Sequence, residues 1–149
     1  MRILFLCTHN SARSQMAEAL LRHLSNGRVE AFSAGTEVYN VHPLAVAVMA
    51  DLGLDIGAQR SKHVAAFERD AFTHIITVCD RVREQCPVFP GDPEHIHWSL
   101  ADPAAVTGDN ETQRRAFAAT ASQLSVRVHH LLPLLGTDKR RHQGSDAVI

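Results

Sequence analysis

Residues 3–14 read Ile3-Leu4-Phe5-Leu6-Cys7-Thr8-His9-Asn10-Ser11-Ala12-Arg13-Ser14. The apolar run that opens this stretch is typical of a parallel strand buried on both faces. An apolar stripe at helical spacing covers residues 16–24 and ends at Asn26-Gly27. The stretch therefore predicts a strand, a tight loop and a helix in direct succession, which is the repeating unit of α/β folds.

Short apolar runs and helical stripes alternate along the rest of the chain. We expect strands at 29–32, 75–78 and 95–98, and helices at 43–52 and 112–132. Such alternation requires right-handed crossovers, so it predicts an α/β parallel sheet of about four strands with helices on both faces. The 149 residues suit a single domain, which we place at 1–136. Residues 137–149 lack apolar periodicity and are expected to form a flexible tail.

The composition argues against several classes of protein. A net charge of -1 gives no basic surface for nucleic acid and no polybasic patch for a membrane. No apolar run approaches the ~20 residues of a membrane span, and the first run is too short for a signal-peptide core. Three cysteines are an odd number, which argues against a secreted disulfide framework. We therefore expect a cytoplasmic protein with reduced cysteines.

Cys7 and Arg13 flank the loop between the first strand and the first helix. The backbone N–H groups of such a loop and the helix N-terminus form a concave anion site, made by Thr8, His9, Asn10, Ser11, Ala12, Arg13 and Ser14. The Arg13 guanidinium suits two parallel hydrogen bonds to an oxyanion. The same positive field predicts a lowered pKa for the Cys7 thiol. The alternative is a buried structural cysteine near a surface arginine.

The stretch from Cys7 to Glu18 resembles the oxyanion loop of the low-molecular-weight protein tyrosine phosphatase superfamily, and more narrowly that of its thiol-dependent arsenate reductases. The resemblance covers about residues 1–135 and includes Ser33-Ala34-Gly35-Thr36 and the stretch 97–103. It implies a flavodoxin-like strand order and a tetrahedral oxyanion in the loop. That oxyanion would be arsenate, with phosphate or sulfate as competitors.

Two further cysteines, Cys79 and Cys86, follow the third expected strand. If residues 80–85 are helical, the two α-carbons lie ~10.5 Å apart along the axis, whereas a disulfide needs them within roughly 7 Å. A bond between them requires this helix to unwind, and Val82 is its only apolar anchor. The spacing alone leaves open that the two thiols never meet.

The resemblance implies a disulfide relay. Cys7 attacks arsenate, Cys79 then attacks Cys7 as arsenite leaves, and Cys86 attacks Cys79 to give a Cys79–Cys86 disulfide. Thioredoxin is the expected reductant, and a glutaredoxin-like protein is the alternative. The resemblance also makes Asp102, in Asp102-Pro103, the general acid for the departing oxygen; the alternative is a surface turn.

Two other functions remain open at this point. A phosphatase would use the same Cys7, Arg13 and Asp102. However, Gln15 stands where these phosphatases usually have proline, and Ala104 where they tend to have an aromatic residue. A non-catalytic redox or zinc-binding module would use Cys79, Cys86, His95 and His97, but the cysteine spacing does not match the usual zinc knuckle. We expect neither a cofactor nor a metal.

The chain departs from the family pattern at three positions. His9 stands where glycine is usual, and it either takes a left-handed backbone or lies at the surface. Ala12 stands where a second loop cysteine often occurs. The resemblance implies a cation site beside the loop, formed by Asn10, Glu18, Ser33 and an aspartate, but Lys62 replaces that aspartate. We expect the Lys62 ammonium to pair with Glu18, and Asn10 to hydrogen-bond to Ser33.

Overall fold

The computed structural model describes residues 1–83 and 86–135. The tail predicted at 137–149 lies outside these residues, as do positions 84–85 of the helix expected at 80–85. Four strands are present: β1 (Arg2–Cys7), β2 (Glu30–Gly35), β3 (His74–Thr77) and β4 (Glu94–His97). The helices are α1 (Arg13–Leu24), α2 (Pro43–Asp51), α3 (Asp80–Arg83) and α4 (Asn110–Leu135), with 3-10 turns η1 (Val64–Phe67) and η2 (Pro103–Ala105).

The strands form one parallel sheet in the order β2-β1-β3-β4. This confirms the predicted flavodoxin-like order, in which the direction of winding reverses between β1 and β3. Functional groups collect at the carboxyl edge of such a sheet next to that reversal. The end of β1 leads into the loop at 8–12, and the end of β3 leads directly to Cys79.

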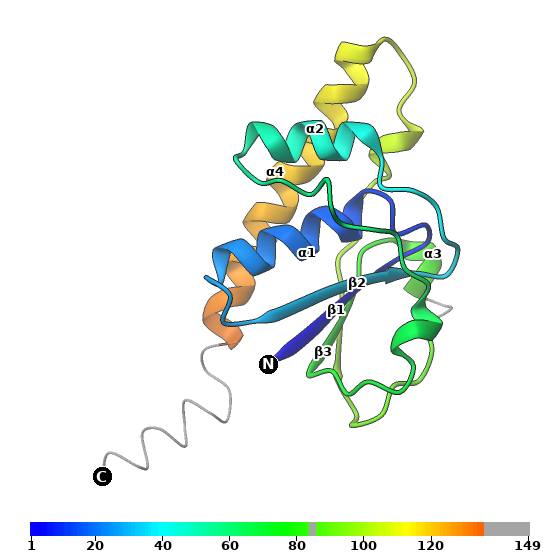
Figure 1. The fold of residues 1–149 in the computed structure, drawn as a ribbon, viewed down its shortest axis with the longest axis vertical. Helices are drawn as coiled ribbons and strands as arrows, with labels where there is room; N and C mark the ends of the chain where they lie inside the picture. The colour runs from blue at the N-terminus through cyan, green and yellow to red at the C-terminus, as the bar shows by residue number, and fades with distance from the viewer. Residues whose placement is uncertain (84–85, 136–149) are drawn as a thin grey trace.

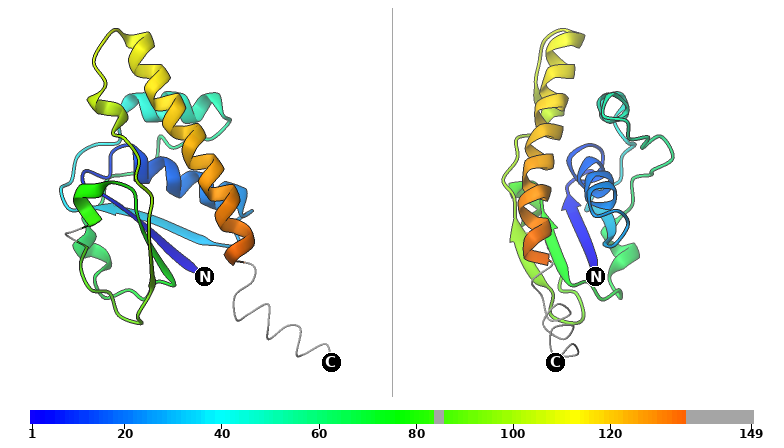
Figure 2. Two further views of the ribbon diagram at one scale, coloured as in Figure 1. Left: turned by 180° about the vertical axis from the view of Figure 1, so that it is seen from behind. Right: turned by 90° about the vertical axis from the view of Figure 1, so that its left-hand side faces the viewer.

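The two faces of the sheet are covered differently. Figure 1 shows α1 and α4 along one side of the strands, with α2 beyond them, and Figure 2 shows the same layers from two other sides. Ser33 of β2 faces α1, as the hydrogen bond from its hydroxyl to Glu18 shows. Its neighbour Phe32 points the other way, where its ring contacts Phe67 and Phe72 near η1.

The core is continuous with β1 at its centre. Residues 3–6 of β1 are fully buried, as the apolar run predicted for a strand that is covered on both faces. Two helices are longer than their apolar stripes, because a stripe marks only the turns that face the core. Thus α1 starts at Arg13, directly after the loop, and α4 starts near Asp109, whose carboxylate accepts the Thr112 N–H at 2.8 Å. Within residues 1–83 and 86–135, none of the helices has the length and apolar character to cross a membrane.

Candidate active site

The loop at 8–12 lies against the end of β2. A Cβ added to Gly35 would come within 2.6 Å of the Thr8 carbonyl oxygen and 2.8 Å of the Asn10 nitrogen. Only glycine therefore allows the loop to approach this closely. The left-handed residue of the loop is Asn10, with φ of 52°, and not His9. Asparagine adopts this conformation more readily than most residues. The left-handed alternative for His9 was therefore wrong, and His9 lies partly exposed at the surface.

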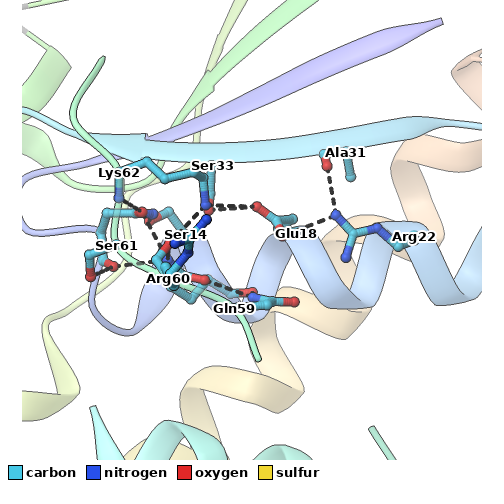
Figure 3. A network of polar contacts seen from close by, with 11 residues as sticks. Ser14, Glu18, Arg22, Ala31, Ser33, Gln59, Arg60, Ser61 and Lys62 are labelled. Atoms are coloured by element: carbon cyan, nitrogen blue, oxygen red, sulfur yellow. Dashed lines mark hydrogen bonds and ion pairs between the residues drawn. The ribbon is translucent and has the colours of Figure 1, made fainter. Parts of the chain in front are cut away.

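Asn10 is fully buried and fixes the shape of the loop. Its amide donates to the Ser14 hydroxyl at 2.8 Å, and its side-chain oxygen accepts from the Lys62 N–H and the Gln15 amide, both at 2.8 Å. The Ser61 hydroxyl donates to the Asn10 carbonyl oxygen at 2.7 Å. The segment 59–62 thus holds the loop from outside, which Figure 3 shows in part.

Gln15 completes this support. Its amide also donates to the Arg60 carbonyl at 2.9 Å, and its oxygen accepts from Gln59 at 2.7 Å. The sequence distinguished Gln15 only as a residue that differs from the phosphatase pattern, and it carried no signal for Gln59. These contacts depend on the path of the chain after α2. That segment shows no hydrophobic periodicity from which its position could be predicted.

Glu18 is a buried carboxylate that Ser33 and two cations surround. Ser33 donates to it at 2.7 Å, Arg22 lies 3.0 Å away, and the Lys62 ammonium lies 3.7 Å away (Figure 3). Burial lowers the pKa of Lys62 despite the opposing attraction of Glu18. Lys62 also donates to the Arg60 carbonyl at 2.9 Å. Among the described residues Ser33 bonds to Glu18 and not to Asn10, so the predicted Asn10–Ser33 bond was wrong.

Cys7 and Cys79 meet at the carboxyl edge of the sheet because β1 and β3 are adjacent. Both side chains are buried, and the Thr8 hydroxyl lies 3.3 Å from the Cys79 sulfur. A hydrogen bond from the Cys7 thiol lowers the pKa of Cys79 to about 5. Hydrogen bonds from Thr8 and the Val82 N–H and the positive charge of Arg13 lower it further.

The pKa of the Cys7 thiol is raised well above its ordinary value. The contact with Cys79 and burial raise it more than Arg13 and the His9 N–H lower it. The expected lowering at Cys7 was therefore wrong, since the sequence could not show that a second thiol touches the first. The lowered pKa favours the thiolate on Cys79 over that on Cys7.

This arrangement predicts the titration of the thiols. Thiolate absorbance in the ultraviolet is expected to rise by one thiolate per molecule as the pH passes through about 5. The Cys86 thiolate should form only above the ordinary thiol range, because burial raises the pKa of Cys86. Cys79→Ser should abolish the first step, and Cys86→Ser should leave it in place. A single rise near the ordinary value of about 8.5 would contradict this assignment.

Arg13 and Asp102 are neighbours beside the loop. The Arg13 guanidinium donates to the Leu100 carbonyl at 2.9 Å and lies 4.0 Å from the Asp102 carboxylate. The other oxygen of Asp102 accepts the Ala104 N–H at 3.0 Å and caps η2. Asp102 is thus both a turn residue and a neighbour of Arg13, so the two interpretations of Asp102-Pro103 are compatible.

Cys86 lies beyond α3, at the far end of the segment that starts at Cys79. It is half-buried, and its thiol contacts the Pro87 carbonyl at 3.6 Å. The next residue, Val88, is 95% exposed. The structure therefore brings Cys7 and Cys79 together and places Arg13 beside Asp102. No contact of Cys86 with these residues is found among the described residues, and all three cysteines are free thiols.

The residues of the alternative zinc site do not converge. Cys79 faces Cys7 and Thr8, whereas His97 is bonded to Thr77 and Asp80. Among the described residues, no group of three or more histidines, cysteines or carboxylates is arranged for a metal ion. The geometry thus gives no support to a zinc-binding module.

The rim of the loop carries an aromatic pair that the sequence did not reveal. The His9 ring stacks on Tyr39 with centroids 4.1 Å apart, and its Nε2 lies 3.8 Å from the Glu37 carboxylate. Tyr39 is 60% exposed. Neither Tyr39 nor Glu37 belongs to a periodic pattern, so their position beside the loop emerges only from the structure.

Comparisons with known proteins point to one family. The family described as low molecular weight phosphotyrosine protein phosphatase matches residues 2–141. An arsenate reductase of Shouchella clausii is 34% identical over 128 residues, which are 85% of this chain and 91% of the relative. A solved arsenate reductase in its phosphate binding state has 30% identity and a TM-score of 0.72, covering 89% of this chain and 96% of that one. A thioredoxin-dependent arsenate reductase of Corynebacterium glutamicum has 29% identity and a TM-score of 0.64, covering 89% and 60%.

Proposed function

Because this chain belongs to the low molecular weight phosphotyrosine protein phosphatase family, we propose that it is an arsenate reductase that works through three cysteines. The observation that carries this proposal is that the buried Cys7 and Cys79 lie next to each other at the carboxyl ends of the adjacent strands β1 and β3, close enough for each thiol to shift the pKa of the other. A phosphatase needs one nucleophilic thiol, whereas reduction needs a second thiol within reach of the first. The similarity to arsenate reductases over most of the chain supports the same substrate.

In the first step arsenate lies in the loop, held by backbone N–H groups and by the Arg13 fork. Cys7 attacks arsenic, and its proton passes to the Cys79 thiolate, which already accepts a hydrogen bond from it. Asp102 protonates the departing oxygen, which leaves as water. The product is an adduct in which the Cys7 sulfur is bonded to arsenic(V).

The second step oxidises two thiols. Cys79 attacks the Cys7 sulfur and passes its proton to the leaving arsenite. The sulfur–arsenic bond breaks, and its electron pair reduces arsenic(V) to arsenic(III). The Cys86 sulfur then attacks Cys79 as its proton passes to the departing Cys7 sulfur, which leaves Cys7 as a thiol and a Cys79–Cys86 disulfide. An external dithiol supplies the two electrons that restore the starting state.

Thioredoxin is the reductant that we propose, acting in the cytoplasm, where thiols are kept reduced. The similarity to a thioredoxin-dependent enzyme supports this choice. The exposed Val88 gives an apolar contact point beside Cys86.

A coupled assay tests the reductase function. With thioredoxin, thioredoxin reductase and NADPH, we expect NADPH oxidation that depends on arsenate and stops in Cys79→Ser. Replacing thioredoxin by glutaredoxin and glutathione should give much slower oxidation. The phosphatase alternative uses the same Cys7, Arg13 and Asp102. Hydrolysis of an aryl phosphate without arsenate-dependent oxidation would establish it instead.

Asp102→Asn tests the general acid. The carboxamide keeps the cap on η2 but has no acidic proton to transfer, so we expect kcat for arsenate to fall by ~10²-fold or more. Sulfate affinity should be unchanged or higher, because a negative charge near the oxyanion is removed. Asp92→Asn, at an exposed loop position, is the matched control. Unchanged turnover in Asp102→Asn would remove this residue from the mechanism.

Lys62 predicts that potassium does not activate the enzyme. Its ammonium lies 3.7 Å from the buried Glu18 carboxylate and supplies a positive charge beside the loop. Arsenate reductase activity is therefore expected to be equal in potassium and sodium chloride at the same ionic strength. Stimulation by potassium over sodium would show that the lysine does not fulfil this role.

A further inference from the structure

Asp80 is the first residue of α3 and directly follows Cys79. Its carboxylate accepts a hydrogen bond from His97 Nε2 at 2.7 Å and another from the Ser99 hydroxyl at 3.1 Å. These three residues form what we call the Asp80 clasp. The reduction steps described above use none of them.

The clasp joins a fixed part of the molecule to the segment between the two cysteines. His97 ends β4 and pairs in register with Thr77 at the end of β3, and the Thr77 hydroxyl bonds to His97 Nδ1 at 2.7 Å. The His97 side chain is only 16% exposed, whereas that of Asp80 is 77% exposed. The sheet therefore fixes the histidine, and the histidine in turn holds the start of α3.

A Cys79–Cys86 disulfide has to close across α3, which follows Cys79 directly and occupies Asp80–Arg83. Because such a bond needs α-carbons within roughly 7 Å, we infer that its formation requires α3 to rearrange. Of the residues of α3, only Val82 is buried, so the sheet holds the helix through few contacts. Unwinding that starts next to Cys79 takes Asp80 away from His97 and Ser99.

We propose that the Asp80 clasp exists only in the dithiol form, where it keeps Cys79 against Cys7, and that it opposes closure of the Cys79–Cys86 disulfide. This inference rests on the proposed relay. The hydrogen bonds from His97 and Ser99 lower the pKa of Asp80, so its carboxylate is ionised at neutral pH. A contact present in only one of two states shifts their equilibrium by its full free energy.

The test is the redox equilibrium of the Cys79–Cys86 pair in full-length Cys7→Ser protein. In glutathione buffers, one oxidised glutathione takes two electrons from the two thiols and yields the disulfide and two reduced glutathiones. Alkylation and mass measurement give the fraction oxidised. Asp80→Ala, Ser99→Ala and His97→Ala are each expected to shift the equilibrium toward the disulfide, on the order of three- to tenfold for the aspartate and histidine.

A double-mutant cycle separates the clasp from an independent effect of Asp80 on α3. If the residues act through one contact, Asp80→Ala combined with His97→Ala shifts the equilibrium no further than the larger single change. The matched control is His95→Ala, an exposed histidine two residues earlier on β4, which should leave the equilibrium constant unchanged.

The outcomes distinguish the clasp from the relay. In one outcome the disulfide forms in Cys7→Ser protein with an equilibrium constant that none of the clasp variants changes. That result overturns the proposed role of the Asp80 clasp and leaves the relay intact. The proposed role of the clasp is also overturned if the double variant shifts the redox equilibrium by the full sum of the shifts of Asp80→Ala and His97→Ala. If Cys7→Ser protein forms no Cys79–Cys86 disulfide even in oxidised glutathione, both the clasp and the relay are wrong.

Discussion

Cys86→Ser is expected to release one arsenite per molecule and then stop. Cys7 and Cys79 remain able to complete the first two steps, because they touch in the folded protein and neither step uses Cys86. The Cys7–Cys79 disulfide then has no internal thiol to open it, and Cys7 and Cys79 are buried away from an external reductant. Steady-state turnover with thioredoxin should fall by ~10³-fold or more, the scale of losing a covalent catalytic group.

The measurement is arsenite per enzyme after rapid mixing, with peptide mapping of the product. Cys86→Ser should give one arsenite and a Cys7–Cys79 disulfide, whereas Cys7→Ser should give none. Sustained turnover in Cys86→Ser at the wild-type rate would mean that the external reductant opens the first disulfide directly.

Arg13→Lys is expected to lower kcat/KM for arsenate by about 10²- to 10³-fold, the usual cost of removing a preorganised oxyanion donor. Lysine keeps the positive charge but loses the planar fork that binds two oxygens at once. It also loses the position that the Leu100 carbonyl fixes for the guanidinium, 4.0 Å from Asp102. Sulfate should bind more weakly in the variant as well.

Arg115→Lys is the matched control. Arg115 is exposed on α4, and among the described residues its ion-pair partner is Glu111 on the same helix. Thermal unfolding of both variants should resemble that of the wild type. A loss of less than tenfold in Arg13→Lys with unchanged sulfate affinity would show that charge alone suffices at this position.

The sequence predicted the sheet and the loop because both depend on local patterns. The buried run at 3–6 and the helical stripe after it define β1 and α1, and the cysteine-to-arginine spacing defines the anion site between them. The pairing of Lys62 with Glu18 also followed from a single position at which the family pattern changes charge.

The remaining features depend on contacts between distant segments. The raised pKa of Cys7 arises from Cys79, which is 72 residues later and meets it only because β1 and β3 are neighbours. Gln15 bonds to Gln59 and Arg60 across the segment after α2. No periodicity marks these contacts, so they could not be read from the chain.

Arsenate is expected to drive the oxidation of Cys79 and Cys86 through Cys7. The most direct test is the free-thiol count and intact mass of fully reduced protein after one equivalent of arsenate without any reductant. We expect the loss of two thiols, with peptide mapping to a Cys79–Cys86 disulfide. Three thiols remaining, in protein whose Cys7 still reacts with an alkylating agent, would contradict it.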